Sequence, residues 1–216
     1  QQKWPHQDAS GLGGVKRELL KGLGRHQEAL QQTWEEFLSH PGEYSYVDLM
    51  GCVPAADRTT WHEKAMEAAE TASLGSCVEL YMKARELNRL AARVSRSKDE
   101  ELRGIYYSRA IDAAKKLAKE HPAEAAALYR GQAIHILDSK KSELYRSAVK
   151  YFSEARRCYE AAGQGEKWRG LVKSVLQEHS RKQSFLAKFQ PLASGEKPVR
   201  EPSFLTRAKR RWNSGE

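Results

Sequence analysis

The sequence has few cysteines and no long apolar run. Its three cysteines, Cys52, Cys77 and Cys158, are widely and unevenly spaced, which fits neither a paired disulfide framework nor a C-x-x-C zinc site. We therefore expect free thiols that are buried or half-buried. No stretch approaches the roughly 20 apolar residues of a membrane span, and the N-terminus does not resemble a signal peptide. These absences predict a cytoplasmic protein that does not contact membranes.

The sequence also lacks the motifs of the common enzyme classes. The glycines at 11–14 are followed neither by the rest of a dinucleotide fingerprint nor by the G-K-[ST] of a phosphate loop. His62 and Glu63 begin like a zinc-protease motif, but the second histidine four residues on is missing. No G-x-S-x-G turn is present. We therefore predict no enzymatic activity, no metal and no cofactor; an unrecognised enzyme would need polar residues brought together only by the fold.

Alternation with a period of two is absent as well, so we predict no β-sheet. Between His121 and Leu176 the sequence instead contains three successive amphipathic helices. The middle one has a single apolar stripe at helical spacing, made of Leu144, Ala148, Phe152, Ala155 and Tyr159. A helix with one apolar stripe must bury it against its neighbours, which favours antiparallel stacking. We predict an all-α protein, an α-solenoid of antiparallel helix pairs with about eight to ten helices.

The preceding part of the chain fits the same plan. Residues 15–41 predict a helical hairpin with a turn near Gly24, in which Val15, Leu19, Leu20 and Leu23 face inward. The run LGRHQEAL at 23–30, followed by Pro41, resembles a tetratricopeptide repeat, although Thr33 and Glu36 differ from its preferred residues. Residues 76–96 predict one or two helices, and the next helix, capped by Ser97 and Glu100, should turn Tyr107 inward. The resemblance implies a tetratricopeptide-like solenoid.

A second resemblance covers residues 107–182. A helix ending in EHP is followed by AEAAALYR, by the pattern Y-x-x-A-x-x-Y-x-x-x-A-R-x-x-Y from Tyr145 to Tyr159, and by Trp168 before H-x-R-K at 179–182. This order is similar to the helical C-terminal region of bacterial proteins that carry SWIM-type zinc fingers, and the similarity extends over about residues 15–190. The finger itself needs C-x-C and C-x-H ligands, which this chain lacks. The resemblance implies an α-solenoid without assigned chemistry.

Composition divides the chain into three parts. Residues 1–14 have no apolar period and predict a flexible lead-in, followed by a helical-repeat domain over 15–190. Residues 191–216 predict a linker and a basic terminal segment. Residues 181–216 hold 9 Lys and Arg against 3 Asp and Glu, so most of the net charge of +9 belongs to the C-terminal end.

The basic tail is the candidate site that the sequence indicates. It contains four cations beside a tryptophan: Arg207, Lys209, Arg210, Arg211 and Trp212. This combination suits binding to nucleic acid, by phosphate contact with base stacking, or to an acidic partner. Two other interpretations stay open. The tail is a solubilising end, or it packs back as a terminal helix whose apolar face is formed by Phe204, Leu205, Ala208 and Trp212.

The function predicted from the sequence is that of a non-enzymatic protein-interaction scaffold, or of one module of a larger protein. Its partner would be another protein, whose peptide or helix binds in the groove of the solenoid. The alternative is a nucleic-acid-associated module that uses the basic tail.

Overall fold

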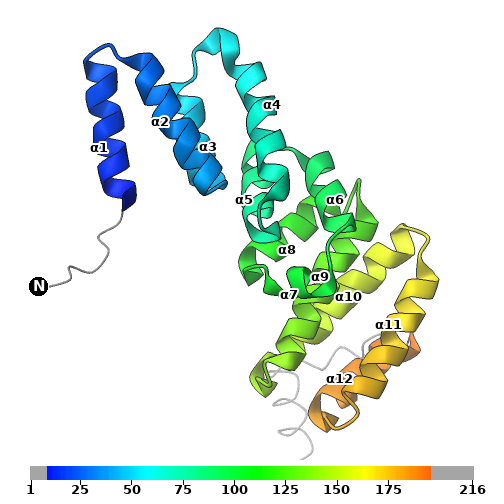
Figure 1. Cartoon of the computed structure of the whole chain (residues 1–216). Helices are drawn as coiled ribbons and strands as arrows, with labels where there is room; N and C mark the ends of the chain where they lie inside the picture. The colour runs from blue at the N-terminus through cyan, green and yellow to red at the C-terminus, as the bar shows by residue number, and fades with distance from the viewer. Residues whose placement is uncertain (1–8, 196–216) are drawn as a thin grey trace, which may run out of the picture.

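The computed structural model describes residues 9–195, and in this part of the chain all the regular structure is helical (Figure 1). It comprises 12 α-helices and three 3-10 turns. The helices are α1 (Ala9–Gly22), α2 (His26–Ser39), α3 (Glu43–Cys52), α4 (Arg58–Ala68), α5 (Leu74–Ala84), α6 (Leu87–Ser95), α7 (Asp99–Gly104), α8 (Tyr107–Leu117), α9 (Pro122–Asp138), α10 (Tyr145–Ala161), α11 (Gly165–Glu178) and α12 (Gln183–Ser194). The turns are η1 (Ala55–Asp57), η2 (Ala69–Thr71) and η3 (Ser142–Leu144). The predicted all-α class is confirmed.

The number of helices exceeds the predicted eight to ten because two breaks have weak sequence signals. Arg85 ends α5 with a φ of 64°, a left-handed conformation that glycine adopts more easily. The helix expected after Ser97 is divided into α7 and α8 by the extended residues Ile105 and Tyr106. The first break has a residue other than glycine at its left-handed position, and the second is marked only by Gly104, the last residue of α7, so both sequence signals are weak.

The helical domain also extends beyond its predicted boundaries at both ends. Because α1 begins at Ala9, residues 9–14 are helical and do not belong to a flexible lead-in. Pro191, expected to begin the linker, lies inside α12. Buried Phe185 and Phe189 hold this helix against the core, which offsets the backbone hydrogen bond that Pro191 cannot donate.

The helices follow one another along an elongated, curved body, with α1 at one end and α11 and α12 at the other (Figure 1). Most consecutive helices pack together, and the most extensive contacts are those of α9 with α8 and with α10. Helices two apart in the chain also touch, as α3 does α5 and α10 does α12, and some three apart touch as well, as α5 does α8 and α6 does α9. The core therefore runs along the molecule and is thickest around α9.

At that thickest point α7 lies very close to α9. A Cβ atom added to Gly131 of α9 would lie 3.0 Å from both the Cβ and the carbonyl oxygen of Leu102 in α7. Next to it, the buried side-chain amide of Gln132 donates to the carbonyl oxygens of Leu102 at 3.1 Å and Ile105 at 3.3 Å. These bonds satisfy carbonyls at the end of α7 that have no partner in their own helix.

The first helix packs differently from the prediction. Leu20 is buried, but Val15, Leu19 and Leu23 are exposed, Leu23 at 69%. The main neighbour of α1 is α2, so the stripe expected to face inward is left without a covering helix. Arg17 ties α1 to the next two helices through Glu36 at 3.4 Å and Asp48 at 2.8 Å.

The C-terminal helices join the core through aromatic rings. Phe189 of α12 lies 5.1 Å, between ring centroids, from Phe152 of α10 and 6.3 Å from Trp168 of α11. Phe185, one turn earlier, stacks on Phe189 at 5.2 Å. The three helices thus share one aromatic cluster, which fixes the position of α12.

Candidate functional site

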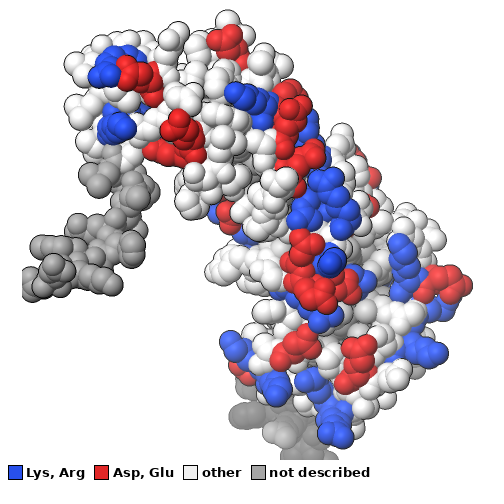
Figure 2. Space-filling view, in the orientation of Figure 1, with Lys and Arg blue, Asp and Glu red and all other residues white. Residues whose placement is uncertain are grey.

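The basic residues put forward by the sequence, Arg207, Lys209, Arg210, Arg211 and Trp212, lie outside the described residues. The charged side chains of residues 9–195 do not form a single basic face in Figure 2, where Lys and Arg alternate with Asp and Glu along the visible side. The candidate sites described below therefore come from other features of the helical domain.

His62 occupies a junction of three helices. Its Nδ1 lies 2.9 Å from the hydroxyl of Tyr46 in α3, and its Nε2 lies 3.1 Å from a carboxylate oxygen of Glu86, which precedes α6. The Arg89 guanidinium lies 3.7 Å from Glu86 and also pairs with Glu63. Both ring nitrogens of His62 are therefore used within the protein.

Burial shifts the pKa of one tyrosine at this junction and of two cysteines elsewhere in the core. Burial raises the pKa of Tyr46 above its usual range, and the Glu86 carboxylate adds to the increase, so the phenol stays protonated. Burial likewise raises the pKa of the Cys77 and Cys158 thiols, which makes them poor nucleophiles. All three cysteines are free, with Cys77 and Cys158 buried and Cys52 half-buried, as predicted. Hydrogen bonding and ion pairing between helices account for the polar groups at this junction.

A second set of charges joins α3, α5 and α8. Glu43, at the N-terminus of α3, lies 3.5 Å from the ammonium of Lys83 and 3.3 Å from the guanidinium of Arg109. Arg109 also lies 3.6 Å from Glu79 of α5. Glu43 is mostly shielded from solvent, which strengthens these interactions relative to fully exposed pairs. The set holds the N-terminal turns of α3 and α8 against α5.

Exposed aromatic side chains flank these ion pairs. Tyr44 follows Glu43 and is 76% exposed; Tyr106 precedes Arg109 by one helical turn and is 72% exposed. Tyr107 is 54% exposed, so the inward position predicted for it is wrong; its ring packs partly on Tyr151 of α10, 6.2 Å away. We call Tyr44, Val47, Tyr106 and Tyr107 the tyrosine surface. Val47, one turn after Tyr44 in α3, is also exposed.

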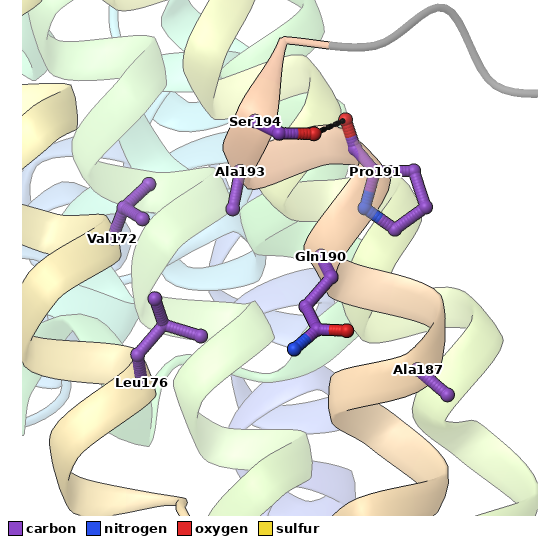
Figure 3. A pocket seen from close by; sticks show the side chains of 7 residues that line it. All are labelled: Val172, Leu176, Ala187, Gln190, Pro191, Ala193 and Ser194. Carbon is purple, nitrogen blue, oxygen red and sulfur yellow. Dashed lines mark hydrogen bonds between the residues drawn. The ribbon is translucent and has the colours of Figure 1, made fainter.

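A groove lies between α11 and α12 (Figure 3). It has a volume of about 590 Å³ and is lined by Val172, Leu176, Ala187, Gln190, Pro191, Ala193 and Ser194. We call it the terminal groove. In Figure 3, Val172 and Leu176 of α11 face α12, and Gln190 and Ala193 of α12 point into the space between the helices. The groove wall is mainly apolar, with a side-chain amide as its largest polar group.

A backbone acceptor also lies at this groove. Proline has no N–H, so Pro191 cannot donate to the carbonyl four residues earlier, which belongs to Ala187. The hydroxyl of Ser194 donates to the carbonyl of Pro191 at 3.3 Å (Figure 3). The Ala187 carbonyl thus lacks its ordinary helical partner, and Ala187 is one of the residues that line the groove.

Within residues 9–195, no group of three or more His, Cys, Asp and Glu side chains is arranged to hold a metal ion. None of the helices in that range combines the length and the apolar character that a membrane span requires. These findings, with the fold and the two surfaces above, define an all-helical protein with an exposed aromatic surface and an apolar groove.

The chain belongs to a family of unknown function (DUF6880), whose model matches residues 2–188. No curated protein matches the chain, and no solved structure does. The comparisons link it neither to tetratricopeptide repeats nor to SWIM zinc-finger proteins, so both resemblances stay predictions. The family match covers the tyrosine surface and the α11 side of the terminal groove but ends within α12.

Proposed function

We propose that the protein is a non-enzymatic interaction module, a tetratricopeptide-like α-solenoid that binds a peptide or helix of a partner protein at the tyrosine surface. The contacts between helices two or three apart in the chain support the solenoid, because stacked helix pairs touch the pairs on either side of them. The partner would be a protein segment with apolar side chains.

The observation that carries the proposal is the exposure of Tyr44, Tyr106 and Tyr107 on helices fixed by ion pairs. A tyrosine brings a large, rigid and partly apolar side chain to an interface at little cost in conformational entropy. Tyrosine is also among the residues that contribute most to binding energy in interfaces. Ion pairs among α3, α5 and α8 hold two of these side chains at helix N-termini in a fixed relation, which lowers the cost of binding.

The surface also suggests the chemistry of its partner. Glu43, Glu79, Lys83 and Arg109 provide both charge signs around the exposed rings. Apolar side chains of a bound segment would pack on the rings of Tyr44 and Tyr106, while its polar groups reach the charged rim. A strongly acidic or strongly basic segment is disfavoured, because this rim would repel part of it.

A peptide library displayed against the full chain tests the proposal. Selected peptides would then be measured by fluorescence anisotropy with the wild type, Tyr44→Ala and Tyr106→Ala. We expect each substitution to weaken binding about tenfold or more, the loss expected at an interface hot spot. Leu23→Ala, at an exposed apolar residue just after the end of α1, is the control and should leave affinity unchanged. Peptides that bind all four proteins equally would disprove the assignment.

The nucleic-acid alternative is favoured by one observation, the concentration of positive charge in residues 181–216. Its test uses labelled duplex and single-stranded oligonucleotides with the full chain, at low and near-physiological salt. Replacement of Arg207, Lys209, Arg210 and Arg211 by glutamine should abolish binding if the tail contacts phosphates, and wild-type binding should weaken steeply as salt increases. Absence of binding at low salt would reject this alternative.

A further inference from the structure

The terminal groove has no partner among the described residues. Its apolar wall on α11 is formed by Val172 and Leu176, and its other side, from Ala187 to Ser194, extends roughly 10 Å along α12 at 1.5 Å per residue. Apolar surface of this kind gains free energy when it is removed from water. A short amphipathic segment is the right size to cover it.

The chain itself continues from the edge of this groove. Ser194 lines the groove, and Gly195, with a φ of 80°, ends α12 in a left-handed conformation that turns the chain away from the helix axis. Residues 196–203 then separate Gly195 from Phe204. Eight residues can span about 26 Å, which is more than twice the length of the groove. A segment beginning at Phe204 can therefore return to it.

The sequence after this spacer has the pattern that such a groove would bind. Phe204, Ala208 and Trp212 are spaced by four residues, and Leu205 adjoins them, so a helix over 204–212 would present all four on one face about 12 Å long. Arg207, Lys209, Arg210 and Arg211 would lie at the flanks and on the opposite face. Trp212 also carries an indole N–H, which can donate to an acceptor at the groove.

We propose that the terminal groove binds the chain's own segment 204–212, through Phe204, Leu205, Ala208 and Trp212. Tethering gives this segment a high effective concentration at the groove, which a free peptide would not have. Binding is driven by apolar contact, because the exposed residues Lys173 and Lys188, which adjoin lining residues of the groove in the sequence, carry the same charge as the segment. Added salt screens this repulsion, so it does not release the segment.

Fluorine NMR of the full chain labelled with fluorotryptophan tests the proposal. The chain has five tryptophans, and the resonance missing from Trp212→Phe identifies Trp212. In the wild type we expect the Trp212 resonance to shift little between H₂O and D₂O, as for a ring shielded from solvent. This solvent shift should remain small at high salt and on dilution. The Trp168 resonance, from a ring packed on Phe189, reports whether α11 and α12 stay in place.

Two substitutions then locate the shielding. Gln190→Arg places a longer, charged side chain in the groove, and Leu176→Ala removes part of its apolar wall; both should give Trp212 the solvent shift of a free tryptophan. Gln177→Arg makes the same change at an exposed residue of α11 that does not line the groove, and it should leave Trp212 shielded.

Any of four results would overturn the proposal. Full solvent shift of Trp212 in the wild type would show that the segment is not docked. Shielding that survives both Gln190→Arg and Leu176→Ala would place the segment elsewhere. Shielding that disappears on dilution would assign the segment in the groove to a second copy of the chain. Shielding that is lost at high salt would indicate an ionic contact instead of apolar docking.

Discussion

At the residue scale, Gly131 marks the closest approach between two helices, and its replacement gives the first prediction. Alanine is normally favoured over glycine inside a helix by roughly 0.5–1 kcal/mol. At Gly131 the new Cβ would lie 3.0 Å from Leu102, so α7 or α9 must shift. We expect Gly131→Ala to lower the free energy of unfolding by about 1–3 kcal/mol, measured by urea denaturation.

Gly170 provides the matched control for this prediction. It lies inside α11, and nothing comes within 4 Å of a Cβ added there. Gly170→Ala should therefore stabilise the protein by roughly 0.5–1 kcal/mol. The two substitutions are chemically identical but should have opposite signs. If both stabilise the protein by the same amount, the helices are not as close at Gly131 as described.

His179 should make stability depend on pH. Burial lowers its pKa below the ordinary value of 6.5, and Lys182 contributes in the same direction. As the pH falls, the unfolded chain therefore takes up this proton before the folded protein does. The contribution of His179 to stability is complete above about pH 6.5 and decreases as the pH falls below that value.

Urea denaturation of the wild type and His179→Gln at neutral and mildly acidic pH measures this effect. Between neutral and mildly acidic pH, the free energy of unfolding should fall more for the wild type than for the variant. All other titrating groups are common to both proteins, so the difference between the two losses reports the effect of His179. Equal losses in the two proteins would show that His179 is not responsible. The side chain's neighbours include Asp138 and Glu178, which act in the opposite direction to Lys182.

Individual buried residues could be predicted where the helix continued on both sides of them. Ala148, Phe152, Ala155 and Tyr159 are buried as their spacing indicated. Leu144, in the same stripe, is partly exposed because it belongs to η3 and precedes the helix. Helical spacing is a local property, but the residue at which a helix begins depends on competing turns that the pattern does not show.

At the element scale, α12 depends on its two phenylalanines for attachment. Phe189 is fully buried among Phe152, Trp168 and Phe185. Phe189→Ala should lower the free energy of unfolding by about 3–5 kcal/mol, since it leaves a cavity in the aromatic cluster. Leu23→Ala removes an apolar side chain that is already exposed, and should change stability by no more than about 0.5 kcal/mol. Urea denaturation measures both variants.

Tryptophan fluorescence gives this prediction a second readout. Because the Trp168 ring lies 6.3 Å from that of Phe189, its emission should change in Phe189→Ala. The emission should not change in Leu23→Ala. A stability loss in Phe189→Ala below that of an ordinary surface substitution would mean that α12 is held by other contacts, such as the bond from Arg156 to the Leu192 carbonyl.

The same scale shows why one helix face was misassigned. Val15, Leu19 and Leu23 have the spacing of a buried stripe, yet they are exposed. Periodicity identifies the apolar face of a helix but not whether another helix covers it. In α1 the covering helix α2 packs on the side that carries Leu20 and Arg17. The side of α1 that packs is set by α2 and by the ion pairs of Arg17. Neither can be inferred from the spacing of the apolar residues.

For the whole molecule, the fold class was predictable and the tyrosine surface was not. The helical period repeats along most of the chain, so an all-α protein followed from local patterns alone. Tyr44 and Tyr106 look like ordinary aromatic residues of a helical protein, most of which are buried. The ion pair between Glu43 and Arg109, which are far apart in the sequence, joins the helix N-termini beside which these two tyrosines lie. Long-range pairing of this kind has no sequence signature.

The last prediction concerns how stability is distributed along the molecule. In an elongated stack each helix is stabilised mainly by its neighbours, so the ends open more easily than the middle. From Gly13 to Gly22 of α1, Leu20 is the single buried residue, whereas α9 has nine buried residues. Native-state hydrogen exchange should therefore show the lowest amide protection in α1, intermediate protection in α2 and α3, and the highest in α9 and α10.

Because Phe185 and Phe189 are buried, α12 should be better protected than α1 although both lie at ends. Equal protection of α1 and α9 would mean that the whole chain unfolds as one cooperative unit, and would contradict the solenoid proposed here.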